Sequence, residues 1–240
     1  MKNILSVVSV VLLFSCQGQN TDIIRNVDAI RFNQLIYQKE GIIIDVRTSE
    51  EFQSGHLKDA SNIDYYSDDF SKKINLVQRD VPIYLYCRSG GRSSSAAKKM
   101  LKLGFKEVYN LNDGISSWIS EELSIVKSES KLINKKTNHN VTKLDIDNFL
   151  KNNQFSLLYI STKWCVPCKK LKPIIDVLQS DFNDINILNI DADINKNEIT
   201  DFNVTSVPVI ILFKNNIEIY RNIGFISKES LYNQLAIVNR

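Results

Sequence analysis

Residues 83–103 read Ile-Tyr-Leu-Tyr-Cys-Arg-Ser-Gly-Gly-Arg-Ser-Ser-Ser-Ala-Ala-Lys-Lys-Met-Leu-Lys-Leu, and this stretch decides the fold class. Its first four residues form a short apolar run that is typical of a buried strand. Gly90 and Gly91 indicate a turn, and residues 93–103 favour a helix that ends at Gly104. A strand that leads directly into a helix is the building unit of a parallel sheet.

The same alternation continues on both sides of this unit. The apolar spacing predicts elements at the following residues: helix 27–39, strand 42–46, strand 83–86, helix 93–103 and strand 108–111. Strands that alternate with helices at these distances indicate a mostly parallel sheet flanked by helices. The first half therefore predicts one α/β domain over residues 23–126.

A second alternating unit follows a polar stretch, residues 127–143, which lacks a convincing period and is interpreted as a linker. The second unit has these predicted elements: helix 144–152, strand 157–161, a helix after Cys165, strand 185–190, and a hairpin of 209–214 with 217–221. Asn215-Asn216 forms the hairpin turn, and Ser227 is placed to begin a last helix. Residues 144–240 thus predict a second α/β domain.

The composition limits the classes of function. The chain has 240 residues, 43% of them hydrophobic and 24% charged, which is ordinary for folded domains. This length allows one or two domains, and the two alternating units favour two. The net charge is only +3, so the sequence carries no footprint of nucleic-acid binding.

The first residues are typical of a processing segment. Lys2 precedes an apolar run, residues 4–14, that is too short to span a bilayer. The run ends in Leu-Phe-Ser-Cys16, which resembles the bacterial lipobox. This resemblance implies a signal peptide over 1–15, lipidation of Cys16, a polar tether over 16–22, and an exported lipoprotein anchored to a membrane of the bacterial cell envelope. The alternatives are an ordinary signal peptide and an uncleaved anchor helix.

Cys87 lies where a strand turns into a helix, so its sulfur is expected near a helix N-terminus. Backbone N–H groups at such a terminus favour an anion, and Arg88 and Arg92 add positive charge. The thiolate should therefore be favoured, and an anionic substrate should be attracted. Gly90 and Gly91 allow the backbone to curl around a single atom.

Several other motifs surround this loop in the sequence. They are Asp45-Val46-Arg47, Glu50-Glu51-Phe52, Gly55-His56-Leu57, Ala60, Asn62-Ile63, Asp113-Gly114 and Trp118. Together with Cys-Arg-Ser-Gly-Gly-Arg they resemble the single-domain rhodanese family. The resemblance implies a parallel sheet flanked by helices and a sulfurtransferase, in which Cys87 takes a sulfane sulfur from a donor such as thiosulfate and holds it as a persulfide. Arg88 and Arg92 would hold the donor's charged end.

Two alternatives for this domain remain open, a phosphatase and an inert binding module. A phosphatase loop needs five residues between its cysteine and its arginine, whereas only four separate Cys87 from Arg92. We expect Asp45 and Arg47 to brace the fold by pairing with each other or a neighbour. His56 is interpreted as a structural residue.

Cys165 and Cys168 are separated by two residues, a spacing that suits zinc binding, a structural clip or a redox dithiol. Zinc requires four ligands and the sequence has no second pair, so no metal is expected. Trp164 precedes the pair and a helix follows it. A helix N-terminus lowers the pKa of the first cysteine, which favours redox chemistry.

With Ser206-Val207-Pro208-Val209, Asn189-Ile190-Asp191 and Gly224, this pair resembles thioredoxin over residues 144–240. The resemblance implies a mixed sheet with helices. It also implies that Cys165 is the exposed nucleophile and Cys168 the resolving thiol. Trp164 would contact substrate, as would Val207 and a cis Pro208 through the backbone. Tyr159 and Ile187 stand where the family has a buried aspartate and its lysine partner, and Val166 replaces a glycine.

We therefore expect an exported enzyme that combines persulfide sulfurtransfer at Cys87 with thiol–disulfide exchange at Cys165 and Cys168, without a cofactor. The dithiol would reduce the Cys87 persulfide, and an electron donor would recycle the dithiol. Two alternatives are a reductase for other exported proteins, with the first domain as a docking module, and two independent domains that share an anchor. The expected partners are a sulfane-sulfur donor, thiol or disulfide proteins, and a membrane reached through the lipid.

Overall fold

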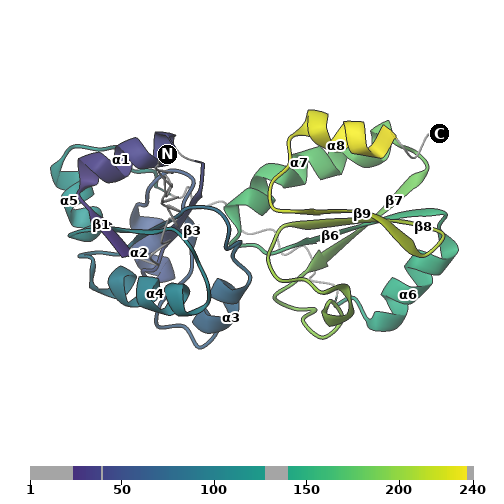
Figure 1. The fold of residues 1–240 in the computed structure, drawn as a ribbon, viewed down its shortest axis with the longest axis horizontal. Helices are drawn as coiled ribbons and strands as arrows, with labels where there is room; N and C mark the ends of the chain where they lie inside the picture. Colours follow the sequence, from purple (N-terminus) through teal and green to yellow (C-terminus); the bar gives the residue numbers. More distant parts are fainter. Residues whose placement is uncertain (1–23, 39, 128–139, 237–240) are drawn as a thin grey trace, which may run out of the picture.

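The computed structural model describes residues 24–38, 40–127 and 140–236. They form two α/β domains that lie side by side (Figure 1). The first contains a five-stranded sheet and the second a four-stranded sheet. The predicted fold class is confirmed, because the first sheet is parallel and the second is mixed.

The first sheet has the strand order β1-β5-β4-β2-β3. Its strands are β1 (Ile24–Val27), β2 (Ile42–Asp45), β3 (Ser61–Asn62), β4 (Ile83–Tyr86) and β5 (Val108–Leu111). All neighbouring strands run parallel. The residues of β4 and β5 are buried throughout, as expected for central strands covered on both faces.

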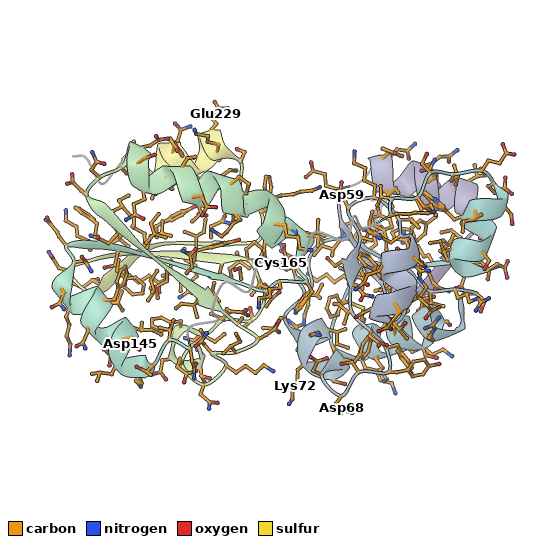
Figure 2. All side chains as sticks on the ribbon, turned by 180° about the vertical axis from the view of Figure 1, so that it is seen from behind. Asp59, Asp68, Lys72, Asp145, Cys165 and Glu229 are labelled. Atoms are coloured by element: carbon orange, nitrogen blue, oxygen red, sulfur yellow. A yellow bond between two sulfur atoms is a disulfide. The ribbon has the colours of Figure 1, made fainter. Side chains whose placement is uncertain are left out.

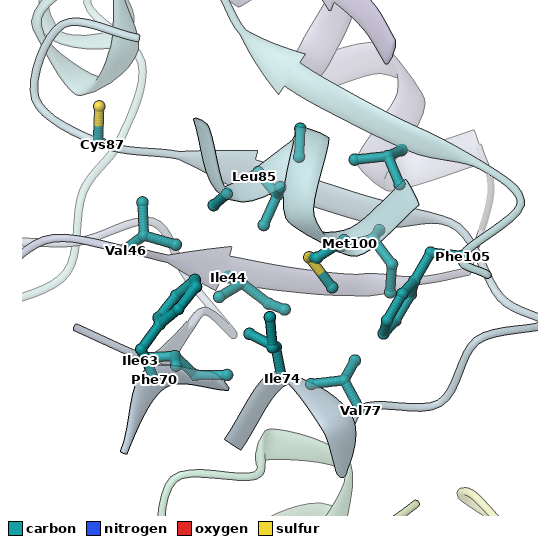
Figure 3. Packing of buried hydrophobic residues seen from close by; sticks show 14 residues of the cluster. Ile44, Val46, Ile63, Phe70, Ile74, Val77, Leu85, Cys87, Met100 and Phe105 are labelled. Atoms are coloured by element: carbon teal, nitrogen blue, oxygen red, sulfur yellow. The ribbon is translucent and has the colours of Figure 1, made fainter. Parts of the chain in front are cut away.

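Helices cover both faces of this sheet. They are α1 (Ala29–Gln38), α2 (Ser49–Ser54), α3 (Phe70–Asn75), α4 (Gly91–Lys102) and α5 (Gly114–Ser120). Buried side chains of α3 and α4 share one core cluster with β2 and β4, and those of α1 and α5 belong to the cluster on the opposite face. Figure 3 shows the first cluster, with Cys87 at one end beside Val46.

The second sheet has the order β7-β6-β8-β9. Its strands are β6 (Phe155–Ser161), β7 (Ile185–Asp191), β8 (Val209–Lys214) and β9 (Ile217–Ile223), and its helices are α6 (Lys143–Asn152), α7 (Val166–Asp181), η1 (Thr200–Phe202) and α8 (Lys228–Leu235). The α7 and α8 helices pack on one face and α6 on the other. Asn215 and Asn216 have the positive φ angles that the hairpin turn requires.

Most of the predicted linker, residues 128–139, lies outside the described residues, and the helix predicted over 144–152 begins one residue earlier than expected. Thr142 caps α6 and forms a capping box with Asp145, so the helix begins at Lys143. The polar residues that cap a helix look like linker in a sequence, which explains the difference. Neither Cys16 nor residues 1–15 fall within the described residues. Among the residues that are described, no helix has the length and apolar character needed to cross a membrane.

Candidate active sites

Cys87 follows the last residue of β4, and the loop behind it turns into α4 at Gly91. Gly90 has a left-handed backbone with φ of 86°, a conformation that suits glycine. The turn aims backbone N–H groups of residues 89, 90 and 93 at the sulfur. The Ser93 hydroxyl lies 3.5 Å from Cys87 Sγ and 3.1 Å from the Gly90 carbonyl oxygen, and its one proton is shared between these two acceptors. A ring of donors therefore surrounds this thiol.

The pKa of Cys87 reflects two opposing effects. Burial raises it, because the thiol is 1% exposed and a charge is poorly solvated there. Hydrogen bonds from the Ser93 side chain and from the loop backbone stabilise the thiolate and outweigh burial, so the pKa of Cys87 is below its usual value. This thiol is therefore prepared to act as a nucleophile.

Replacing the hydroxyl donor tests this balance. The substitution Ser93→Ala is expected to raise the pKa of Cys87, so that iodoacetamide labelling of this cysteine reaches half its maximum rate at a higher pH. Mass spectrometry of the labelled peptide across a pH series measures the shift. Ser94→Ala, one residue further along α4, is the matched control. An unchanged midpoint in Ser93→Ala would show that the backbone donors alone set the pKa.

The two arginines of the loop have different surroundings. Arg92 donates two hydrogen bonds to the Glu51 carboxylate, at 2.6 and 2.8 Å. The Arg92 hydrogen bonds lower the pKa of Glu51 to about 2, which keeps it charged at neutral pH. The Arg88 side chain, in contrast, is exposed to solvent, while that of Arg92 is held by Glu51, and the expectation that both arginines hold an anionic donor stays a prediction. No local sequence pattern links Glu51 to Arg92, which lies 41 residues further along the chain.

Glycine at position 114 allows α5 to brace the Cys87 loop. A Cβ atom there would lie 2.5 Å from the Arg88 carbonyl oxygen, and the residue has φ of 62°. The amide of Ile115 donates to the Cys87 carbonyl at 2.8 Å, and the Ser116 hydroxyl donates to that of Arg88 at 2.9 Å. These bonds fix the loop backbone on the side away from α4. At Gly91, a Cβ would meet nothing within 4 Å, so this residue borders open space.

Three residues of the family motif brace the fold, as expected. The Arg47 guanidinium donates to the Asp45 carboxylate at 2.6 to 3.0 Å, and both side chains are buried. Arg47 also donates to the Gly55 carbonyl. The His56 ring stacks on Phe52 with 3.7 Å between ring centroids. These contacts agree with a structural role.

Cys165 and Cys168 form a disulfide at the start of α7. Cys165 is the N-cap residue of that helix, and its sulfur accepts a hydrogen bond from the Cys168 amide at 3.1 Å. The expected cis peptide joins Val207 to Pro208, and the Val207 carbonyl oxygen lies 3.8 Å from Cys165 Sγ. The dithiol and this backbone therefore form one site.

Tyr159 occupies the position below the dithiol where thioredoxins usually bury an acid. Its hydroxyl donates to the Cys168 carbonyl oxygen at 2.8 Å. Burial raises the pKa of Tyr159 to about 12, so the hydroxyl remains protonated at neutral pH. This side chain can therefore hold the helix start but cannot accept the Cys168 proton.

The dithiol is covered, whereas Cys165 was expected to be an exposed nucleophile. The exposed fractions of Cys165 and Cys168 are 3% and 2%. The covering surface is the first domain: the Val166 amide donates to the Ser61 hydroxyl at 3.2 Å, and the Val207 amide donates to the Leu76 carbonyl at 2.9 Å. Figure 2 shows Cys165 close to the boundary between the two domains. A sequence pattern could not reveal this contact.

Trp164 bridges the two domains. Its ring packs against the core cluster of the first domain and against that of the second. The indole nitrogen donates to the Asp193 carboxylate at 3.0 Å. The side chain predicted to contact substrate thus contacts the first domain here.

The two reactive sites do not face each other in this arrangement. Parallel strands place all their amino ends at one edge of a sheet, and Cys87 follows the carboxyl end of β4. The second domain packs at the opposite edge, since Gly41 and Ile42 at the amino end of β2 line a cavity together with Val166 and Pro167, and Leu76 precedes β4. In this arrangement the two reactive sites therefore lie at opposite edges of the first sheet.

Comparisons with known proteins divide the chain in the same way. The family model described as rhodanese-like domain matches residues 28–121, and the thioredoxin model matches residues 136–236. Protein YqhL of Bacillus subtilis is 40% identical over 76 residues, which cover 32% of this chain and 59% of YqhL. The chain therefore spans less than two thirds of the length of that relative.

Two relatives with described activities match different halves of the chain. The thioredoxin of Chlamydia muridarum is 34% identical over 87 residues, which cover 35% of this chain and 85% of that protein. The thiosulfate sulfurtransferase GlpE of Pseudomonas savastanoi is 34% identical over 86 residues, which cover 35% of this chain and 78% of that protein. Neither similarity extends over both domains.

Proposed function

The chain belongs to both the rhodanese-like and the thioredoxin families, and from this premise we propose that it is an enzyme with two thiol activities. The first is sulfurtransfer at Cys87. The second is thiol–disulfide exchange at Cys165 and Cys168. The observation that carries the proposal is that a thiol with a lowered pKa and a disulfide beside a cis proline occur in the same chain.

Sulfurtransfer begins with the Cys87 thiolate. It attacks the sulfane sulfur of thiosulfate, the S–S bond of the donor breaks, and sulfite leaves with the bonding electron pair. The product is a Cys87 persulfide, whose negative outer sulfur is stabilised by the N–H groups of the loop. Arg88 attracts the anionic donor. The relative named thiosulfate sulfurtransferase supports thiosulfate as this donor.

Thiol–disulfide exchange uses the reduced form of the pair. Cys165, at the N-terminus of α7, attacks a partner disulfide and forms a mixed disulfide. Cys168 then attacks Cys165, which releases the reduced partner and produces the disulfide seen in the structure. Two electrons pass from the dithiol to the partner, so an electron donor must reduce the pair again.

We further propose that the two activities are coupled, with the dithiol reducing the Cys87 persulfide. The persulfide and the two thiols yield the Cys87 thiol, hydrogen sulfide and the Cys165–Cys168 disulfide, which balances atoms and electrons. A random coil of 17 residues, the linker length expected from the sequence, would have an r.m.s. reach of ~23 Å, which would allow the domains to part and meet again. Tethering would keep the effective concentration of the dithiol near millimolar.

A specific observation favours a second candidate function, in which the first domain is a docking module for a disulfide reductase. Arg92 is held by Glu51, and Cys87 is almost fully buried. Both features reduce the access of a donor to this site. Incubation of the full chain with thiosulfate, followed by mass spectrometry, separates the two functions: the added mass of one sulfur atom on Cys87 supports sulfurtransfer, and its absence supports docking.

We also propose that the chain is exported and anchored through Cys16, which the lipobox-like sequence supports. The substitution Cys16→Ser removes the thiol that would carry the lipid. Because the acyl chains provide the anchoring, the protein is expected to move from the membrane fraction to a soluble fraction of the producing bacterium. Labelling with a radioactive fatty acid measures acylation directly. Equal labelling of Cys16→Ser and wild type would contradict the assignment.

A further inference from the structure

The first domain occupies the groove beside the cis proline. The Val207 amide, one residue before Pro208, donates to the Leu76 carbonyl oxygen at 2.9 Å. Because Val207 also lies 3.8 Å from Cys165 Sγ, any protein whose disulfide reaches that sulfur must bring its own backbone past this amide. Leu76 therefore takes the position of a partner backbone.

Side-chain packing completes the cover. Leu76 packs against the second domain's core cluster, which contains both cysteines, and it belongs to neither core cluster of its own domain. On the other side of the dithiol, the Ser61 hydroxyl accepts a hydrogen bond from Val166, a residue between the two cysteines. With the domains in contact, the exposed fractions of Cys165 and Cys168 are only 3% and 2%.

The edge of the contact is polar and weak. Arg79 donates to the Thr205 carbonyl oxygen at 3.3 Å, and Asp59 pairs with Lys170 at 3.2 Å. The side chains of that ion pair are 46% and 53% exposed, so solvent screens their attraction. Contacts of this kind between domains of one chain usually open and close. The first domain is therefore expected to cover the dithiol reversibly.

We propose that residues 76–79 are a built-in occupant of the groove beside Pro208. They take the place of a partner's backbone, so the dithiol reacts with other proteins, and with Cys87, only in molecules whose domains have separated. This inference rests on the proposed thiol–disulfide exchange. The groove accordingly fits partners that present an apolar side chain and a free backbone carbonyl, as Leu76 does.

Opening the contact by mutation tests the cover. Leu76→Asp places a charge against the apolar cluster of the second domain, while Ile119→Asp, an exposed position on α5, is the matched control. The readout is the rate at which a phosphine reductant opens the Cys165–Cys168 disulfide, followed by alkylation and mass spectrometry. We expect a rate at least about tenfold faster in Leu76→Asp, since the rate scales with the open fraction, and no change in Ile119→Asp.

A charge swap provides a second variant that disturbs neither core. Asp59→Lys faces Lys170 with a like charge and should speed reduction severalfold, and adding Lys170→Asp should restore the slow rate. Small-angle scattering should give a larger radius of gyration for the two fast variants. Equal reduction rates in all of these proteins, with sulfur loading at Cys87 intact, would overturn the cover.

The same set of proteins separates this inference from the proposed function. If the disulfide opens faster in Leu76→Asp but no variant reduces a protein disulfide such as that of insulin, the cover is supported and the exchange activity fails. If wild type and Leu76→Asp reduce insulin equally well and open equally fast, the activity is supported and the cover fails.

Discussion

The substitution Cys87→Ser is expected to abolish sulfurtransfer and to leave the reduction of an outside protein disulfide intact. A serine hydroxyl cannot take up a sulfane sulfur, and loss of a nucleophile costs a rate factor of roughly 10³ or more. The assay measures transfer of sulfur from thiosulfate to an added acceptor, with insulin reduction measured in parallel. The donors around position 87 remain, so the fold of the loop should persist.

Cys168→Ser is the matched control for this prediction, because it also removes a thiol but lies outside the first domain. It should load sulfur on Cys87 as the wild type does. If Cys87→Ser lost neither activity, the first domain would act as a docking module. If it lost both, sulfur at Cys87 would be needed for exchange at the dithiol, and the two activities would not be separate.

The substitution Cys165→Ser should have the opposite pattern. Exchange with protein disulfides should fall by a factor of roughly 10³ or more, because Cys165 is the N-cap residue of α7 beside Val207, whereas Cys168 lies inside the helix and cannot replace the attacking thiol. Loading of Cys87 by thiosulfate should remain, but turnover supported by a dithiol-recycling system should fall. Insulin reduction and sulfide release measure the two effects. Cys168→Ser should instead accumulate a mixed disulfide between Cys165 and its partner.

Unchanged sulfide release in Cys165→Ser would remove the link between the domains. The chain would then be two independent enzymes that share one polypeptide. In the proposed mechanism the dithiol reaches Cys87 only when the domains separate. Leu76→Asp opens the contact between the domains, so sulfide release should also be compared in that background.

The sequence was a good guide to the elements that build the two cores. The apolar run of β4 predicted its bounds without error, as did that of β5, because both strands are buried throughout. The elements β1, α2, β3, α3 and α5 of the first domain were not predicted from the sequence, and α2 and β3 show the opposite reason. No residue of α2 is buried, so it has no apolar period, and β3 has only two residues. Short elements at an edge carry little pattern.

The candidate sites were predictable only in part. Local motifs identified Cys87, the two cysteines of the disulfide and the cis proline. The ion pair between Arg92 and Glu51 joins residues 41 positions apart, and no local pattern reveals such a pair. The contact of the first domain with the dithiol could not be predicted either, because nothing in the sequence distinguishes Leu76 from the apolar residues of its own domain's core. Its partners come from the second domain.

We propose that electrons pass from the dithiol to the sulfur on Cys87 within one molecule. The most direct test adds thiosulfate to the fully reduced chain and follows sulfide and the Cys165–Cys168 disulfide together in a single turnover. We expect equal amounts of both products, a rate independent of protein concentration, and no sulfide from Cys87→Ser. A persulfide that persists on Cys87 while both dithiol cysteines stay reduced would contradict it.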